Sequence, residues 1–232
     1  MAQPDVTLRA SLRTPRAAGV AGIVFSLLLG TTLILIRLAA PAEASEGNAW
    51  LTDPGARRSI VIALNLVPFA GIAFLWFIGV IRDRVGDRED RFFATVFLGS
   101  GLLFVGMLFV GAAVAGGLLA DTAAQAGRIP SPELWDLEQR VIFTLLNVYA
   151  IRMGAVFILS TTAIGSRTGV IPRWLALAGY AAAAILLFLV TISPWVNLVM
   201  PVWAFVLSVH ILVKSSTIEE QIEGAEAEPA GG

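Results

Sequence analysis

Long apolar runs separated by short polar segments make up most of this chain. A transmembrane helix needs about 20 predominantly apolar residues to cross the roughly 30 Å hydrocarbon core of a bilayer. The runs that reach this length cover residues 17–38, 59–81, 92–120, 141–165, 173–192 and 195–213. The pattern therefore predicts an all-α membrane protein, in which residues 17–213 form a bundle of six transmembrane helices.

The segments at both ends of the predicted bundle are polar. Residues 1–16 contribute three arginines, whereas residues 214–232 contain five glutamates and end in Pro-Ala-Gly-Gly. A charged segment with few apolar residues cannot bury enough surface to fold, so we expect the acidic tail to be disordered. The last two runs meet at Ser193-Pro194, which predicts a tight hairpin with Pro194 in the first turn of the final helix.

The distribution of basic residues predicts the orientation. Cytoplasmic loops carry an excess of Lys and Arg. If the N-terminus is cytoplasmic, the inner segments hold ten of these residues and the outer segments and their borders hold five. We therefore expect both termini on the cytoplasmic side of a bacterial cell membrane.

The first run also has features of a signal peptide, because basic residues precede it and an Ala-x-Ala site follows at Ala42 to Ala44. However, its apolar core is longer than the usual 7 to 15 residues, and Arg37 separates that core from the site. We interpret the run as an uncleaved helix, and a cleaved signal peptide is the alternative.

Small residues follow the first and third runs with different spacings. A spacing of four places side chains on one helix face and allows close approach of a neighbouring helix, whereas a spacing of five winds around the helix. The first pattern consists of Ala18, Gly22, Ser26 and Gly30, and the second of Gly101, Gly106, Gly111 and Gly116. We expect one packing face on the first helix and either general close packing or bending in the third.

The loop before the fourth run contains a helix-start signal at Ser131-Pro132-Glu133. Ser is a favoured N-cap, Pro fits the first helical position, and Glu is stabilised near the positive end of the helix dipole. These residues predict a short interfacial helix that leads into the fourth run. We expect Trp135 to lie at headgroup level.

Composition excludes several classes of function. Hydrophobic residues make up 57% of the chain and charged residues 14%, the net charge is −1, cysteine is absent, and His210 is the only histidine. There is no basic surface for nucleic acid, no thiolate ligand and no set of histidines for haem or a metal. Every Asp and Glu lies outside the apolar runs or at their ends, which disfavours a proton-carrying transporter. We expect no enzyme activity, cofactor or metal.

Arg152 is the one charge near the middle of an apolar run. An arginine at the centre of a transmembrane helix costs roughly 2.5 to 3.5 kcal/mol on insertion scales, so we expect it to face the bundle interior or a wet cavity. Tyr149 lies three residues earlier on the same face. Two interpretations stay open: carbonyls, asparagines or water satisfy the guanidinium, or it binds a carboxylate, phosphate or lipid headgroup.

An asparagine occurs in the outer half of each even-numbered run, at Asn65, Asn147 and Asn197. The short repeats around them are consistent with duplicated hairpins, with an asparagine layer that bonds between helices, or with chance. In the ligand-binding interpretation, these three side chains and Tyr149 line a cavity around Arg152.

The segment between the second and third runs reads Gly-Val-Ile-Arg-Asp-Arg-Val-Gly-Asp-Arg from Gly79 to Arg88. It resembles the cytoplasmic loop between helices two and three of major facilitator transporters, whose pattern is Gly-x-x-x-Asp-Arg-x-Gly-x-Arg/Lys. The residues that fit are Gly79, Asp83, Arg84, Gly86 and Arg88. The resemblance covers ten residues and implies a gating loop, although six helices form only half of such a transporter.

Two further segments resemble uncharacterised six-helix bacterial membrane proteins of unknown function. They are Arg16 to Gly22, entering the first helix, and Gly169 to Leu175, entering the fifth. This resemblance implies a six-helix fold and no particular activity.

These patterns together favour a non-enzymatic integral membrane protein with a structural or accessory role. The alternative is a small transporter, or a protein that binds an anionic lipid or ligand through Arg152. Besides the bilayer, the expected partners are further copies of the chain or a larger membrane complex.

Overall fold

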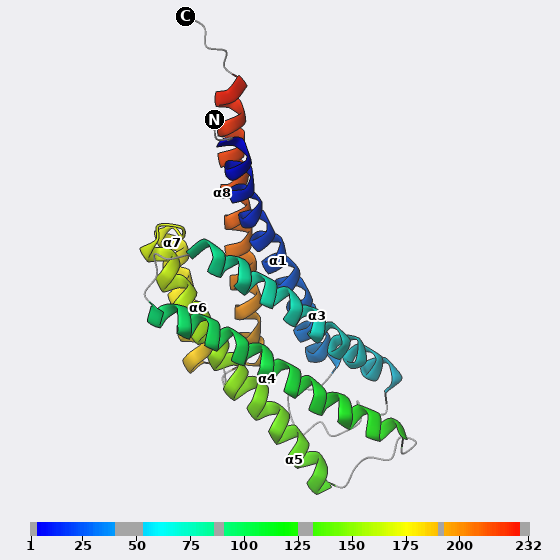
Figure 1. The fold of residues 1–232 in the computed structure, drawn as a ribbon. Coiled ribbons are helices and arrows are strands. Elements are labelled where there is room, and N and C mark those ends of the chain that lie inside the picture. The colour runs from blue at the N-terminus through cyan, green and yellow to red at the C-terminus, as the bar shows by residue number, and fades with distance from the viewer. Residues whose placement is uncertain (1–3, 40–52, 86–90, 125–131, 190–192, 228–232) are drawn as a thin grey trace, which may run out of the picture.

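The computed structural model describes residues 4–39, 53–85, 91–124, 132–189 and 193–227, and their regular structure is entirely helical (Figure 1). In chain order, the α-helices and the two shorter helical segments η3 (a π-helix) and η4 (a 3₁₀-helix) are α1 (Pro4–Ala39), α3 (Pro54–Val85), α4 (Arg91–Ala124), α5 (Pro132–Phe143), η3 (Thr144–Ala150), α6 (Ile151–Arg167), α7 (Arg173–Phe188), η4 (Pro194–Leu198) and α8 (Val199–Ala227).

Five helical stretches are long and apolar enough to cross a membrane, which confirms a helical membrane bundle in its main features. They cover Gly19–Ala39, Pro54–Arg82, Ala94–Asp121, Leu137–Arg167 and Trp195–Ser216. The predicted fifth run is shorter: α7 has 16 residues, or about 24 Å at 1.5 Å per residue. It is therefore shorter than the hydrocarbon core of an average bilayer.

A few pairs of helices account for most of the packing. Helix α1 lies along α3 and α8, while α4 contacts α3 and the continuous α5–η3–α6 helix, against which α7 also packs. The two ends of the chain lie at the same end of the bundle (Figure 1). In the same view, α1 and α8, which pack against each other, both extend beyond the other helices at this end.

Helix α8 continues to Ala227, so the acidic segment is helical over most of the range predicted to be disordered. Glu, Gln, Ala and Lys all have high helix propensity, and the chain arrives there already in a helix. Propagating an existing helix avoids the cost of nucleation. The prediction of a disordered segment from residue 214 was therefore wrong as far as Ala227.

The fourth membrane helix begins as predicted with Pro132 in its first turn, but it is continuous from α5 through η3 to α6. Trp135 is buried and packs with Ile60, Leu118 and Leu119, where the start of α3 meets the end of α4. Its side chain therefore packs against protein, and its position at headgroup level stays a prediction.

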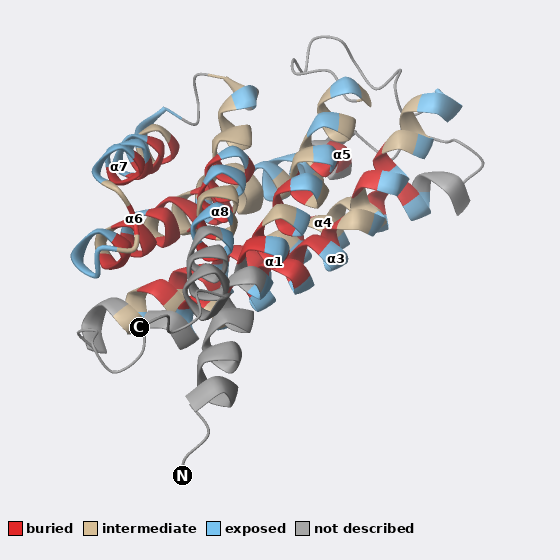
Figure 2. Ribbon diagram, turned by 90° about the horizontal axis from the view of Figure 1, so that it is seen from above, coloured by how far each residue is buried: buried red, intermediate tan, exposed pale blue. Residues whose placement is uncertain are grey.

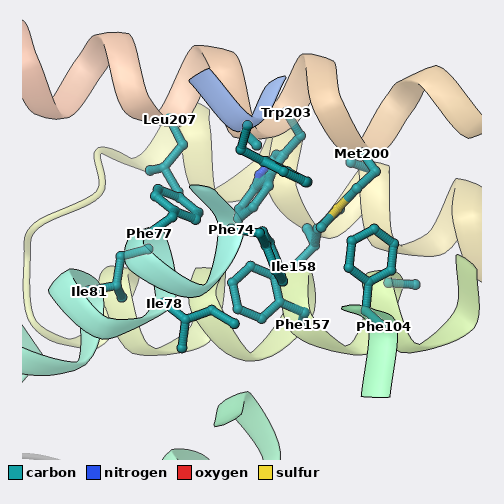
Figure 3. Close-up of a cluster of buried hydrophobic side chains, with 14 of the residues drawn as sticks. Phe74, Phe77, Ile78, Ile81, Phe104, Phe157, Ile158, Met200, Trp203 and Leu207 are labelled. Carbon is teal, nitrogen blue, oxygen red and sulfur yellow. The ribbon is translucent and has the colours of Figure 1, made fainter. Parts of the chain in front are cut away.

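Aromatic side chains fill the centre of the bundle (Figure 3). Phe74 lies 4.5 Å from Phe25 and 4.8 Å from Phe157, and Phe157 also contacts Phe97 and Trp203, as measured between ring centroids. Tilted and edge-to-face pairs at such distances are the favoured arrangements of aromatic rings. Buried residues line the sides of the helices that face this centre, whereas exposed residues occupy the outer sides (Figure 2).

The glycines of α1 support the predicted packing face in part. A Cβ at Gly22 would collide with Ser208 on α8 and Phe77 on α3, so α1 approaches both helices closely there. Gly19, which was not in the predicted pattern, is similarly close to Leu212, whereas Gly30 has open space beside it.

In α4, the glycines at a spacing of five alternate between contact and open space. Gly101 packs against Ile78 and Phe157, and Gly111 packs against Leu146, but Gly106 and Gly116 have nothing within 4 Å of an added Cβ. The absence of a single glycine face agrees with the prediction for this helix.

Candidate functional site

Arg152, the second residue of α6, lies on the side of the helix that faces away from the core. Residues 152, 156, 159 and 163 share this side at helical spacing, and none of them is buried; Leu159 is 40% exposed. The opposite side carries Phe157 and Ile158, both completely buried. Of the two environments expected for Arg152, the packed interior is wrong, because the side chain is half-buried on the outer side of α6.

The described hydrogen bond of the Arg152 guanidinium stays within its own helix. Its Nη1 donates to the carbonyl oxygen of Val148 at 3.0 Å, one turn earlier. An arginine carries five N–H donors. Within the described part of the chain, no carboxylate lies within salt-bridge distance of Arg152 and no second hydrogen-bond acceptor contacts it.

The turn before Arg152 is a π-helix, η3, which the sequence did not reveal. The amide of Ile151 bonds back five residues to the carbonyl of Leu146. The Arg152 guanidinium donates to the Val148 carbonyl of this turn, and π-helical turns occur frequently at functional sites.

Two of the predicted asparagines meet directly beside this turn. The Asn197 side-chain nitrogen on η4 donates to Oδ1 of Asn147 on η3 at 2.8 Å. This bond links the last membrane helix to the fourth, which is the interhelical role considered for the asparagine layer. The Oδ1 of Asn197 is itself buried without a hydrogen-bond partner among the described residues.

The other two predicted members of the site lie differently. Asn65 is exposed on α3 and its side chain bonds to the carbonyl of Val61 in its own helix at 2.7 Å, so it does not join the asparagine pair. Tyr149 is 52% exposed and precedes Arg152 by three residues. The structure thus groups Arg152, Asn147 and Asn197 around η3, with Tyr149 on the outer surface.

Arg37 and Trp195 lie close together at the end of the bundle that contains η4. The Arg37 guanidinium, in the last turn of α1, lies 5.9 Å from the ring centroid of Trp195 in η4. This is the geometry of a cation–π contact, and Trp and Arg are typical of the membrane interface. Both residues stand near the ends of apolar runs in the sequence, but only the fold shows that they meet.

η4 begins at the predicted Pro194 and meets the fourth membrane helix partway along its length, while residues 190–192, which join it to α7, lie outside the described residues. Ser193 caps η4 by accepting a hydrogen bond from the amide of Trp195 at 3.4 Å, and Pro194 is the first residue of η4. Asn197 then contacts Asn147, 15 residues after the start of α5 at Pro132. The part of the fourth membrane helix before Asn147 packs against α4, which contacts both α5 and η3.

The remaining polar groups of the interior mostly bond to their own helices. Ser160 and Thr161 donate to carbonyl oxygens at 2.8 and 2.7 Å, as expected for hydroxyls within a helix. Thr162 departs from this expectation because its buried hydroxyl has no partner among the described residues. His210 packs edge-on against Trp174 at 6.3 Å between ring centroids, in agreement with a packing role.

The segment that resembles the major facilitator loop lies partly outside the described residues, and its described part, Gly79 to Val85, belongs to α3. Gly79 is exposed on α3, and the backbone of Asp83 and Arg84 belongs to the end of the same helix. Gly86 and Arg88 lie outside the described residues. Their gating role stays a prediction.

Comparison with protein-family models, curated proteins and solved structures gives no match to this chain. The resemblance to uncharacterised six-helix bacterial membrane proteins therefore stays a prediction.

Proposed function

We propose that this multi-pass membrane protein is a non-enzymatic structural or accessory component of the bacterial cytoplasmic membrane, with both termini inside. The observation that carries this proposal is the filled interior. Phe74, Phe157 and Trp203 meet at the centre of the bundle, each at most 4% exposed. A substrate path through this part of the bundle would need the space that these rings occupy.

The accessory role requires a partner, and the outward apolar faces are where one would bind. Trp76 on α3 and Leu177 on α7 are 70% and 72% exposed. A photo-crosslinking amino acid at either position should give a discrete crosslinked species in native membranes, whereas the same probe at the buried Ala204 should not. The proposal fails if probes on every outward helix face recover neither a homo-oligomer nor another protein.

Anion binding at the surface of the bundle is a second candidate, favoured by the single described hydrogen bond of Arg152. In this role Arg152 binds a carboxylate or phosphate, with Tyr149, Asn147 and Asn197 nearby and Asn65 further away. A panel of carboxylate and phosphate compounds should shift the unfolding temperature of the wild type but not of Arg152→Ala. Equal shifts in both proteins would exclude this role.

A further inference from the structure

Arg152 lies in the middle of the apolar stretch that carries it across the membrane. The stretch covers Leu137–Arg167, so Arg152 comes 15 residues after its first residue and 15 before its last. At 1.5 Å per residue this is about 22 Å of helix on each side, whereas the hydrocarbon core extends only about 15 Å from its centre. The guanidinium bonds to Val148 O, one turn from its own Cα. The charged group therefore stays within the hydrocarbon layer, below the headgroups of either leaflet.

The neighbouring helix α4 gives a similar depth for this region. A Cβ at Gly111 of α4 would meet the side chain of Leu146. Gly111 lies ten residues before the end of the apolar stretch Ala94–Asp121, which corresponds to about 15 Å of helix. Arg152 follows Leu146 by six residues, in the direction away from that end of the membrane.

The side of α6 that carries Arg152 faces outward along its whole length. Helix α6 packs against α4 and α7, and Phe157 on the opposite side is completely buried. None of the outward residues is buried, and Leu159 is 40% exposed. We call this side the Arg152 face; it consists of Arg152, Val156, Leu159 and Ala163, at helical spacing. It therefore presents an apolar strip to the bilayer, with a cation at the depth of the hydrocarbon layer.

A second copy of the chain does not supply the anion that this cation needs. Charged side chains within membrane segments pair with one another or with backbone carbonyls. Among the five membrane-crossing stretches of the described structure, the acids are Asp121, at the end of one, and Glu138, at the start of another. A copy inserted in the same orientation holds both at the membrane edge, far from the level of Arg152. An acid at the matching depth therefore has to come from a different protein.

We infer that the Arg152 face binds a transmembrane helix of another membrane protein, which carries an aspartate or glutamate near the middle of its span. A guanidinium fork matches the two oxygens of a carboxylate, and opposite charges attract more strongly in a medium of low dielectric than in water. A single polar position within an apolar packing strip also fixes the register of the partner helix. This inference rests on the proposed accessory role and supplies the class of partner that the role requires.

Binding of a designed transmembrane peptide to the full-length protein in phosphatidylcholine vesicles tests the inference. The aspartate peptide is a leucine–alanine helix of about 20 residues with one central aspartate. Energy transfer from the six tryptophans of the protein to an acceptor on the peptide measures its affinity. The wild type should bind the aspartate peptide roughly tenfold or more tightly than Arg152→Leu does, because removing one member of a buried charge pair is costly.

Two controls separate the charge pair from general helix association. A leucine peptide, with leucine in place of the aspartate, should bind the wild type and Arg152→Leu equally and weakly. Arg140→Leu is the matched variant, because Arg140 is an exposed cation of the same continuous helix, 12 residues before Arg152. Arg140→Leu should bind the aspartate peptide like the wild type.

Equal affinity of the aspartate and leucine peptides for the wild type would overturn the inference, and this comparison needs no variant to fold. Equal affinity of the aspartate peptide for the wild type and Arg152→Leu would overturn it as well. Glu43 and Glu46 belong to a loop outside the described residues. If the aspartate peptide binds a variant that combines Glu43→Gln and Glu46→Gln but not the wild type, the loop supplies the anion and the inference is wrong. A crosslinked partner at Trp76 or Leu177, with no effect of Arg152→Leu on peptide binding, would overturn this inference and leave the accessory role intact.

Discussion

The aromatic centre of the bundle and the polar cluster around η3 (Arg152, Asn147 and Asn197) differ in burial and in the contacts that hold their side chains. Phe157 touches rings from α3, α4 and α8 and has no exposed surface, so its contribution comes entirely from packing. Arg152 lies five residues earlier on the same helix. Its side chain is half-buried, and its described hydrogen bond is to the backbone carbonyl of Val148 in the same continuous helix. The charged side chain is therefore found where the packing of the bundle is less complete.

The largest expected effect comes from opening the aromatic centre. Phe157→Ala should lower the free energy of unfolding by about 3 kcal/mol, because truncating a buried Phe leaves a cavity. Leu159→Ala is the control, since Leu159 is on the exposed side of the same helix. Thermal or denaturant unfolding in detergent measures both. Similar losses for the two variants would show that the centre is not the more tightly packed region.

A second substitution tests whether close packing extends to α1. A Cβ at Gly22 would collide with Ser208 and Phe77, so Gly22→Ala should destabilise the protein by about 1 to 3 kcal/mol. Gly30→Ala, on the same helix, meets nothing within 4 Å and should be neutral or slightly stabilising because Ala favours helix. If Gly22→Ala unfolds like the wild type, α1 does not approach α3 and α8 this closely.

The smallest effect concerns the polar cluster itself. A double-mutant cycle with Asn147→Leu and Asn197→Leu should give a coupling energy of about 0.6 kcal/mol, the average for hydrogen bonds between membrane helices. Pairing Asn65→Leu with Asn197→Leu is the control, because Asn65 bonds within its own helix. A coupling energy near zero for Asn147 and Asn197 would remove the link between η3 and η4.

The helical membrane fold could be predicted because each apolar run carries its own evidence of length and composition. Pro194 and Pro132 were also predictable, since a first-turn proline depends only on local backbone geometry. The helical end of α8 was not predicted, because the compositional argument for disorder ignores the helix that precedes the tail. The burial of Trp135 was not predicted for a related reason: it depends on Ile60 and Leu118, which are distant in the sequence.

The candidate site was partly predictable. Arg152 stands out as a charge in an apolar run, and the three asparagines stand out by their similar depth. Only the fold could show that Asn147 and Asn197 bond while Asn65 does not. The π-helical turn was also invisible, since nothing in Thr144 to Ala150 distinguishes it from an ordinary helix.

By itself, the sequence determined that this chain builds apolar helices and that no acid between Glu138 and Glu219 can neutralise Arg152. These conclusions follow from composition and spacing, which act locally. The tertiary structure decided which way Arg152 faces, because the direction of a side chain is set by the helices that pack against the opposite face. Phe157 and Ile158 turn toward the core of α3, α4 and α8, and this packing leaves Arg152 at the surface of the bundle.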